Sequence, residues 1–440
     1  MLKHSFEKFT RNPSLLIPST NSRIFSTDFK TIKRISINCN EFSRFSQSNY
    51  IYVDKTPLIA SMIQSGKFYS ISRPDSFGKT LLLKTIKEIF EGNQSLFNGT
   101  YIFNKPELFQ KTPVLFYDFG ITFRPATVSI FTEMIKNLLQ KSAETYQIKL
   151  NKNLPVHEMF GNLIEGIKDK LGPVVILIDN FDKITLETIQ YQKKRNDLIE
   201  ILTKILASLK EKEENIKFFV KTNTSLIGFR TYLHEKIQIK DITLDSNFSQ
   251  ILGFSDEELK NNFGDYLNFY ESQSTLLPHQ IKSLIKSAFG GYRFTSENKE
   301  LYNPQGFLNY LSKGNPDDFE INLSFPKYMK DYLQQNFVYG MPIKEFAGNF
   351  EILSQEYFKE ALNKKWGKNH VFQKKDFFLT DANNLELHLF NHGFMAIKDY
   401  NEEKNEFEIN YVNNTIRRNL IKVYDEVYEK SKSYVEPFSG

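Results

Sequence analysis

The stretch Ser72-Arg73-Pro74-Asp75-Ser76-Phe77-Gly78-Lys79-Thr80 decides the fold class of this chain. The residues just ahead of it, 67–72, are typical of a β-strand, and the apolar spacing over 79–90 predicts a helix. A loop between a strand and a helix that opens with Gly-Lys-Thr is the setting of a phosphate-binding loop. In such a loop, backbone N–H groups and the helix N-terminus hold phosphates. The motif is incomplete, because Arg73 stands where its first glycine is expected.

Each polar residue of this loop has an expected role. Arg73, Phe77, Gly78, Lys79 and Thr80 are the candidate cofactor-binding residues. Lys79 is expected to reach the outer phosphates of a nucleotide, and the Thr80 hydroxyl is expected to ligate Mg²⁺. The implied cofactors are therefore ATP and Mg²⁺, if the loop binds a nucleotide at all.

A second element lies about a hundred residues further along the chain. The apolar run Val174–Ile178 is typical of a buried parallel strand, and Asp179 follows it directly. An aspartate that ends an apolar strand is the usual partner of a phosphate-binding loop and ligates the same Mg²⁺. Asp179 is therefore the second predicted metal ligand, beside Thr80, and Asp179 and Asn180 are the candidate catalytic positions.

The first half of the chain alternates between strand and helix patterns. Strands are predicted at 113–119 and 216–221, and helices at 128–146, 156–170 and 195–213. This alternation predicts an α/β P-loop NTPase-like domain, a parallel sheet with helices on both faces.

After residue 236 the strand pattern fades. Helices are predicted at 256–263, 278–288, 305–312, 326–335 and 354–364, and a hairpin at 394–400 and 406–411. We therefore predict a P-loop domain over 40–235, a helical lid-like domain over 236–315, and a mainly helical C-terminal region over 316–440 that contains the hairpin 394–411.

Composition excludes several kinds of site. The 440 residues include 57 Lys and Arg against 52 Asp and Glu, and one cysteine, Cys39. One cysteine excludes an internal disulfide framework and a cysteine-based zinc site. The near balance of charge gives no strong signal for nucleic-acid binding. No run approaches the roughly 20 apolar residues of a membrane span, so membrane contact is expected only through partners.

Residues 1–25 have the pattern of a mitochondrial presequence. Leu2, Phe6 and Phe9 share one face of a short helix, and the segment holds four basic residues and one acidic residue. Arg23 stands three residues before a cleavage position between Phe25 and Ser26. We therefore expect a matrix location; an ordinary N-terminal segment without a targeting role is the alternative.

The chain resembles the AAA-ATPase-like family, whose members often join a P-loop domain to a nuclease of the PD-(D/E)xK type. The shared short motifs, which occur in order over about residues 41–415, are Tyr52-Val53-Asp54-Lys55-Thr56, Ser72 to Thr80, Phe90-Glu91-Gly92, Leu177 to Asp182, Gly253-Phe254-Ser255, Gly291 to Phe294, Tyr302-Asn303-Pro304 and Gly393-Phe394. The resemblance implies a P-loop ATPase fold. No nuclease residues follow the last motif.

Three departures from the family pattern affect the chemistry. Asp75 and Ser76 replace two arginines of the loop, so a carboxylate stands beside the expected triphosphate. Asn180 replaces the glutamate that orients the attacking water, and an amide cannot accept a proton from that water. After the strand at 216–221 the family's Thr-Gly is missing; Asn223 is a weak candidate for a phosphate sensor and Thr222 the runner-up.

Three functions remain open from the sequence. The first is a degenerate, catalytically impaired protein that serves as a structural or accessory subunit of a larger mitochondrial assembly, for example a respiratory-chain or ribosomal complex, with protein subunits as partners. The second is an active ATPase with an altered loop, because Lys79, Thr80 and Asp179 are all present. The third, a nucleic-acid-processing protein, rests only on the nuclease-bearing relatives.

Overall fold

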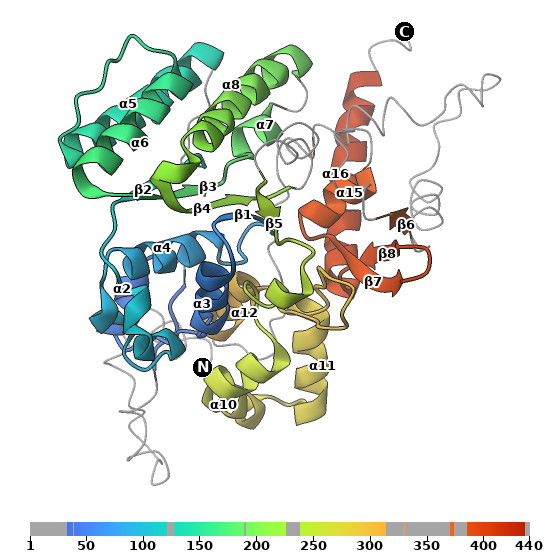
Figure 1. The fold of residues 1–440 in the computed structure, drawn as a ribbon. Coiled ribbons are helices and arrows are strands. Elements are labelled where there is room, and N and C mark those ends of the chain that lie inside the picture. The colour runs from blue at the N-terminus through green and yellow to red at the C-terminus, as the bar shows by residue number, and fades with distance from the viewer. Residues whose placement is uncertain are drawn as a thin grey trace. The chain divides into compact units, whose positions relative to one another are not determined.

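The computed structural model describes residues 33–37, 39–120, 127–188, 191–225, 238–313, 330, 370–373 and 385–435 (Figure 1). The chain divides into two compact units. The sheet unit comprises Lys67–Pro74, Pro113–Thr243 and Asn322–Gly440, and the helical unit comprises Met1–Gly66, Asp75–Thr112 and Leu244–Ile321. The chain therefore leaves the sheet unit inside the loop at 72–80 and re-enters it at Pro113.

A five-stranded sheet in the order β2-β3-β4-β1-β5 forms the centre of the sheet unit. Every neighbouring pair of its strands runs parallel. All six residues of β3 are buried, as expected for a central strand of a parallel sheet. The strands are β1 (Phe68–Ser72), β2 (Val114–Asp118), β3 (Val174–Asp179), β4 (Ile216–Asn223) and β5 (Lys240–Asp241). The predicted α/β class is confirmed.

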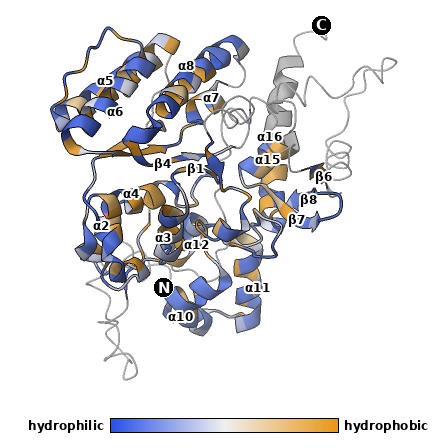
Figure 2. Ribbon diagram, in the orientation of Figure 1, coloured by the Kyte–Doolittle hydropathy of each residue, from blue (hydrophilic) through white to orange (hydrophobic). Residues whose placement is uncertain are grey.

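Three long helices of this unit lie on one side of the sheet (Figure 1). They are α5 (Val128–Tyr146), α6 (Val156–Leu171) and α8 (Gln192–Glu211), and the short α7 (Lys183–Glu187) and η4 (Glu213–Asn215) accompany them. Their apolar faces share one core with alternate strand residues. Figure 2 shows that these helices carry both hydrophobic and hydrophilic residues along their length. This core includes Leu115, Ile135, Leu163, Ile176, Leu202 and Phe219.

The helical unit is built from short helices around an aromatic-rich core. Ser255 begins α10 with a capping box, in which its hydroxyl and the Glu258 carboxylate each accept a backbone N–H. The core includes Val53, Phe263, Phe289, Phe307 and Tyr310. The elements are α2 (Phe42–Gln47), α3 (Thr56–Ser65), α4 (Lys79–Phe90), η1 (Gln94–Phe97), η2 (Tyr101–Asn104), η3 (Pro106–Leu108), η5 (Ser246–Phe248), α10 (Asp256–Gln273), α11 (Pro278–Phe289) and α12 (Pro304–Lys313).

The C-terminal part of the chain contains a small antiparallel sheet in the order β6-β8-β7. The predicted hairpin is confirmed as β7 (Met395–Asn401) and β8 (Glu406–Tyr411), and β6 (His370–Gln373) adds a strand that was not predicted. Helices α15 (Leu385–Asn391) and α16 (Asn414–Val435) flank these strands in sequence. The helices predicted at 326–335 and 354–364 lie outside the described residues, apart from Lys330.

Most of the other predicted elements are confirmed within a few residues. The main difference is α10, which continues ten residues beyond the predicted end at Phe263, to Gln273. Its second half buries Tyr270, whose hydroxyl donates to Leu311 O at 2.6 Å. None of the described helices combines the length and the hydrophobicity that a transmembrane span requires.

Lys55 of the Asp54-Lys55-Thr56 motif joins two parts of the helical unit. Its Nζ donates to Glu258 Oε1 at 2.6 Å and to Gln250 O at 2.8 Å. Asp54 accepts the N–H of Thr56 through Oδ1 and the N–H of Tyr101 through Oδ2. The motif therefore stabilises the fold of this unit, because a mostly buried ion pair needs both partners.

Replacing Lys55 by Met should lower the free energy of unfolding by about 2 kcal/mol, because it leaves the Glu258 carboxylate mostly buried without its cation. Urea unfolding of the full chain measures this loss. The matched control is Lys84→Met, which removes a more exposed pair with Glu41 and should cost less than about 1 kcal/mol. Equal losses in the two variants would contradict the structural role of Lys55.

Candidate functional site

The phosphate-loop segment has the local structure that its sequence predicts. Strand β1 ends at Ser72 and α4 begins at Lys79. Two residues of the loop have positive φ angles, Ser76 at 70° and Gly78 at 95°. Gly78 adopts this backbone without strain, whereas Ser76, which has a Cβ atom, adopts it at some cost. The turn that ends in the N-terminus of α4 is therefore present despite the altered loop sequence.

The Phe77 side chain anchors this loop in the helical unit. Phe77 is buried, and its ring lies 4.9 Å from that of Tyr292 and 5.5 Å from that of Phe294, both in edge-to-face geometry. A Cβ atom on Gly253 would lie 3.4 Å from the Phe77 ring, so that glycine allows close packing here. Because its ring is packed against aromatic residues, any contact of Phe77 with a phosphate would have to come from its backbone N–H.

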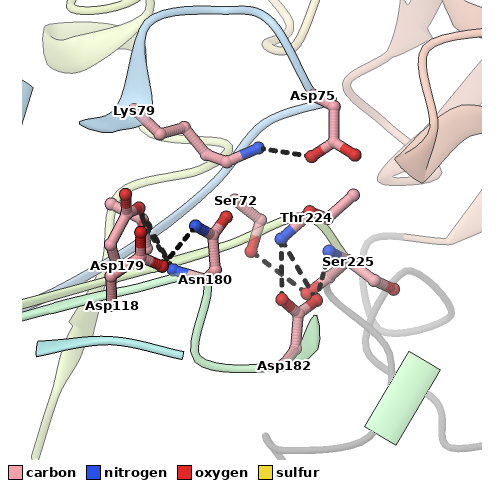
Figure 3. Close-up of polar contacts among 10 residues, drawn as sticks. Ser72, Asp75, Lys79, Asp118, Asp179, Asn180, Asp182, Thr224 and Ser225 are labelled. Atoms are coloured by element: carbon pink, nitrogen blue, oxygen red, sulfur yellow. Dashed lines mark hydrogen bonds and ion pairs between the residues drawn. The ribbon is translucent and has the colours of Figure 1, made fainter. Parts of the chain in front are cut away.

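Lys79 is paired with the carboxylate that the chain carries in place of an arginine. Its Nζ lies 3.3 Å from Asp75 Oδ1 (Figure 3). The Lys79 side chain is 4% exposed and that of Asp75 is 49% exposed. The lysine that would reach the outer phosphates of a nucleotide thus already contacts a negative group of the same loop. The sequence predicted the carboxylate beside the phosphate position, but not its ion pair with Lys79.

Asp179 ends β3 in the sheet unit and is held by the neighbouring strand. It is fully buried, and its Oδ1 accepts hydrogen bonds from the Thr222 hydroxyl and, at 3.1 Å, from the Asn180 N–H. Thr222, the runner-up phosphate sensor, thus orients the predicted metal ligand. The first candidate, Asn223, donates through Nδ2 to Ser70 Oγ at 3.1 Å and to Ser72 Oγ at 3.3 Å.

Asn180, in the position of the family's glutamate, points toward the end of β2. Its φ angle is 53°, and its Nδ2 donates to Asp118 Oδ1 at 2.9 Å (Figure 3). The same oxygen accepts the Gly120 N–H at 2.8 Å. Asp118 was not among the residues predicted from the sequence. The available signal was that Asp118, like Asp179, directly ends an apolar strand.

Four charged side chains lie near the carboxyl ends of β1, β4 and β5. They are Arg73, Asp182, Lys221 and Asp241. Arg73 is buried and donates through Nη1 to Ser72 O and Thr243 O, each at 2.9 Å. Lys221 is buried on β4, 5.2 Å from the Phe181 ring centre, and donates to Asn223 Oδ1 at 3.3 Å. Burial lowers the pKa of Arg73 to about 9 and that of Lys221 to about 8, although Asp241 opposes both shifts.

The fourth member of this group, Asp182, fixes the end of β4. Its carboxylate accepts the N–H of Thr224 at 2.9 Å and that of Ser225 at 2.6 Å (Figure 3). Asp182 also opposes the lowering of the Lys221 pKa. Arg73, one of the predicted cofactor-binding residues, therefore has a side chain that is hydrogen-bonded inside the sheet unit.

The predicted site residues are distributed over both units. Arg73, Asp179 and Asn180 lie in the sheet unit, whereas Phe77, Gly78, Lys79 and Thr80 lie in the helical unit. Across the part of the chain that the structure describes, no group of three or more His, Cys, Asp or Glu residues has the arrangement of a metal site. The Mg²⁺ ligation assigned to Thr80 and Asp179 stays a prediction.

Comparison with known proteins finds a family match for part of the chain. Residues 36–230 match the model of the AAA-ATPase-like family, described as "Predicted AAA-ATPase". A protein of Azotobacter chroococcum mcd 1, named "Uncharacterized protein in vnfD 5'region", is 24% identical over 325 residues. That match covers 73% of this chain and 60% of the relative, so the chain spans less than two thirds of the relative's length.

Two solved structures of Aeropyrum pernix proteins are also similar. The ORC2 protein in its ADP form is 11% identical with a TM-score of 0.32, over 88% of this chain and 98% of that one. The ORC1 protein in complex with DNA is 10% identical with a TM-score of 0.34, over 88% of this chain and 96% of that one. The AAA-ATPase-like P-loop fold assigned here to residues 36–230 rests on the family match and on the parallel sheet.

The low pKa of Lys221 predicts a pH-dependent stability. Its pKa is 10.5 in the unfolded chain and about 8 in the folded protein. The charged form of Lys221 is therefore less favourable in the folded protein than in the unfolded chain. The unfolded state then binds more protons between these values, and stability rises as the pH rises from 8 to 10.5.

Lys221→Met lacks this contribution. The stability advantage of Lys221→Met over the unaltered chain should therefore shrink by about 2 kcal/mol between pH 7 and 9.5, as measured by urea unfolding. Lys240→Met, at an exposed position of β5, is the control and should show no such pH-dependent difference. A constant difference for Lys221→Met across this range would argue against a buried, weakly basic lysine.

Proposed function

We propose, from the AAA-ATPase-like P-loop fold of residues 36–230, that this protein is a catalytically impaired member of that family and acts as an accessory or structural subunit of a larger assembly. The observation that carries the proposal is the ion pair between Lys79 and Asp75. It gives the phosphate-binding lysine a negative partner within its own loop. Protein subunits of that assembly are the proposed partners.

The ion pair weakens nucleotide binding in two ways. A triphosphate must take the place of Asp75 beside Lys79, and the displaced carboxylate then stands near phosphates of the same charge. Two like charges about 4 Å apart repel by about 1 kcal/mol in water and about 4 kcal/mol near a protein surface. Each 1.4 kcal/mol is a factor of ten, so the affinity for ATP should be lowered by about 5- to 700-fold.

Hydrolysis is impaired at a separate position. The side chain of Asn180 is a neutral amide that donates its N–H to Asp118. An amide can hydrogen-bond to water but cannot take its proton, and loss of a general base typically lowers a rate by about 10²- to 10⁴-fold. Impaired turnover is therefore expected even where a nucleotide binds.

The second candidate function is an active ATPase with an altered loop. It is favoured by the retention of Lys79 and Thr80 at the start of α4 and of Asp179 at the end of β3. These residue types fit a bound Mg-ATP, since an amine meets phosphates and a hydroxyl and a carboxylate ligate Mg²⁺. Direct measurement of nucleotide affinity separates the two candidates.

Asp75→Asn removes the charge with little change of shape and should raise the affinity for Mg-ATP at least about fivefold, because Lys79 then loses its competing partner. Isothermal titration calorimetry measures this change. Adding Lys79→Ala to this variant should abolish the gain. Asp169→Asn, which removes a carboxylate that is 73% exposed on α6, is the matched control and should leave binding unchanged.

Two results would contradict the proposal of a catalytically impaired protein. If the unaltered chain turns over ATP well above background and Lys79→Ala abolishes that turnover, the protein is the active ATPase of the second candidate function. An Asp75→Asn variant that binds no more tightly than the unaltered chain would show that the ion pair does not limit binding.

The proposed assembly is mitochondrial. Support comes from the basic, amphipathic pattern of residues 1–25 and from the arginine at Arg23 ahead of Phe25 and Ser26. We place the mature protein on the matrix side, where its partners would be subunits of a respiratory-chain or ribosomal complex. This location is independent of the nucleotide chemistry.

Incubating the full chain with isolated mitochondria should give a protease-protected product whose N-terminal residue is Ser26, as determined by N-terminal sequencing. Arg23→Ala should be imported but should keep a longer N-terminus, because the cleavage position loses its arginine. Lys33→Ala, which lies beyond the predicted presequence, is the control. A chain that stays outside the organelle at full length would exclude the mitochondrial location.

A further inference from the structure

Asp118 lies at the same level of the sheet as the predicted metal ligand. It is the last residue of β2, and the parallel pairing of β2 with β3 makes it the register partner of Asp179. Register partners on neighbouring parallel strands present their side chains to the same face of a sheet. Two carboxylates therefore stand side by side where β2 and β3 end.

Asn180 follows Asp179 directly, and its side chain is hydrogen-bonded to Asp118. Its left-handed backbone, at φ 53°, turns the chain sharply after β3. Its amide Nδ2 donates to Asp118 Oδ1 at 2.9 Å, and its N–H donates to Thr222 Oγ1 at 3.1 Å. The side chain at position 180 is thus held by the end of β2, and its backbone N–H by Thr222 of β4.

Gly120 packs against this pair. A Cβ atom on Gly120 would lie 2.6 Å from Asn180 Nδ2, closer than real contacts allow. The Gly120 N–H donates to the same Asp118 oxygen that Asn180 contacts, at 2.8 Å. The close approach of Gly120 therefore restricts the Asn180 side chain, whose hydrogen bond to Asp118 is drawn in Figure 3.

We propose that Asp118 and Asn180 act as one hydrogen-bonded pair. The carboxylate lies on β2, and its amide donor occupies the position where the family resemblance implies a glutamate. Asp118 is a positioning residue for Asn180. It also disfavours a second acid at position 180, so the water-activating carboxylate cannot be restored there while Asp118 is present. This inference rests on the proposed function only where it assigns position 180 to the attacking water.

Charge explains the exclusion. An acid at position 180 would place two carboxylate oxygens at hydrogen-bond distance without a donor between them, with the buried Asp179 as a third acid nearby. Like charges so close destabilise the folded state, and more strongly where they are partly removed from water. The pair should tolerate exchange of its two members far better than loss of its donor.

Isosteric exchange tests the pair without changing its volume. Asn180→Asp alone should lower the melting temperature of the full chain by at least about 5 °C at pH 7.5, because it creates facing carboxylates. Asp118→Asn alone should have a small effect. The double variant Asp118→Asn/Asn180→Asp restores a donor between the two side chains, but the amide nitrogen at position 118 can no longer accept the Gly120 N–H. It should therefore regain part of the loss.

The outcome of this exchange decides the inference. A double variant more stable than the sum of the single effects supports the pair, including the case in which Asn180→Asp alone fails to fold and the double variant folds. Additive effects contradict it. So does a double variant that fails to fold when Asn180→Ala folds, because a removed donor would then be tolerated better than an exchanged one.

Turnover tests the consequence for chemistry. In a chain carrying Asp75→Arg and Ser76→Arg to restore the loop charges, Asn180→Glu alone should leave ATP hydrolysis at background. Adding Asp118→Asn should raise it at least tenfold. Restoration by Asn180→Glu alone would overturn the exclusion. If no variant binds ATP, the charge diagnosis of the proposed function fails, and the melting temperatures alone judge the pair.

Discussion

Parallel pairing of the central strands is the constraint on which the rest of the site depends. Because β1, β2, β3 and β4 run in the same direction, their last residues meet at one edge of the sheet. Asp118, Asp179 and Asn223 each occupy such an end, and Asn180 follows directly. The hydrogen bond between Asn180 and Asp118, which are 62 residues apart in sequence, is a consequence of this strand direction.

The short motifs shared with the family are largely explained by packing within the helical unit. Lys55 pairs with Glu258, just after Gly253-Phe254-Ser255, and Tyr302 donates to Asp256 at 2.7 Å. Phe77 of the phosphate loop packs against Tyr292 and Phe294. Several of these motif residues therefore hold the loop and its neighbours in place, whereas Asp75 places a negative charge beside Lys79.

Sequence patterns predicted the elements of the fold well and the contacts of the site only in part. Hydrophobic periodicity located the strand before Asp179 and the helix that begins at Lys79, because burial leaves a clear pattern in a long element. It did not locate β5 or β6, which are two and four residues long and too short to show a period. The polar half of α10 was missed because its one fully buried residue, Tyr270, gives little periodic signal.

The site residues also divide into those that a local sequence pattern locates and those that depend on contacts between distant segments. The places of Lys79 at the start of α4 and of Asp179 and Asn180 at the end of β3 could be predicted, because each lies beside a clearly periodic element. The Asn180 contact with Asp118 depends on the register between β2 and β3, and no local pattern encodes that register. The burial of Lys221 was also missed, because a lysine in a strand usually indicates an exposed face.

Binding and hydrolysis are restrained to different degrees. The carboxylate of Asp75 is half exposed on a loop, so turning it away from Lys79 exchanges one ion pair for contacts with water, which costs about 1 kcal/mol or less. The Asn180 amide is held by Asp118 and packed against Gly120, and releasing it removes one of the donors of a partly buried carboxylate. A nucleotide can therefore displace the first contact far more easily than a water molecule can be activated at the second.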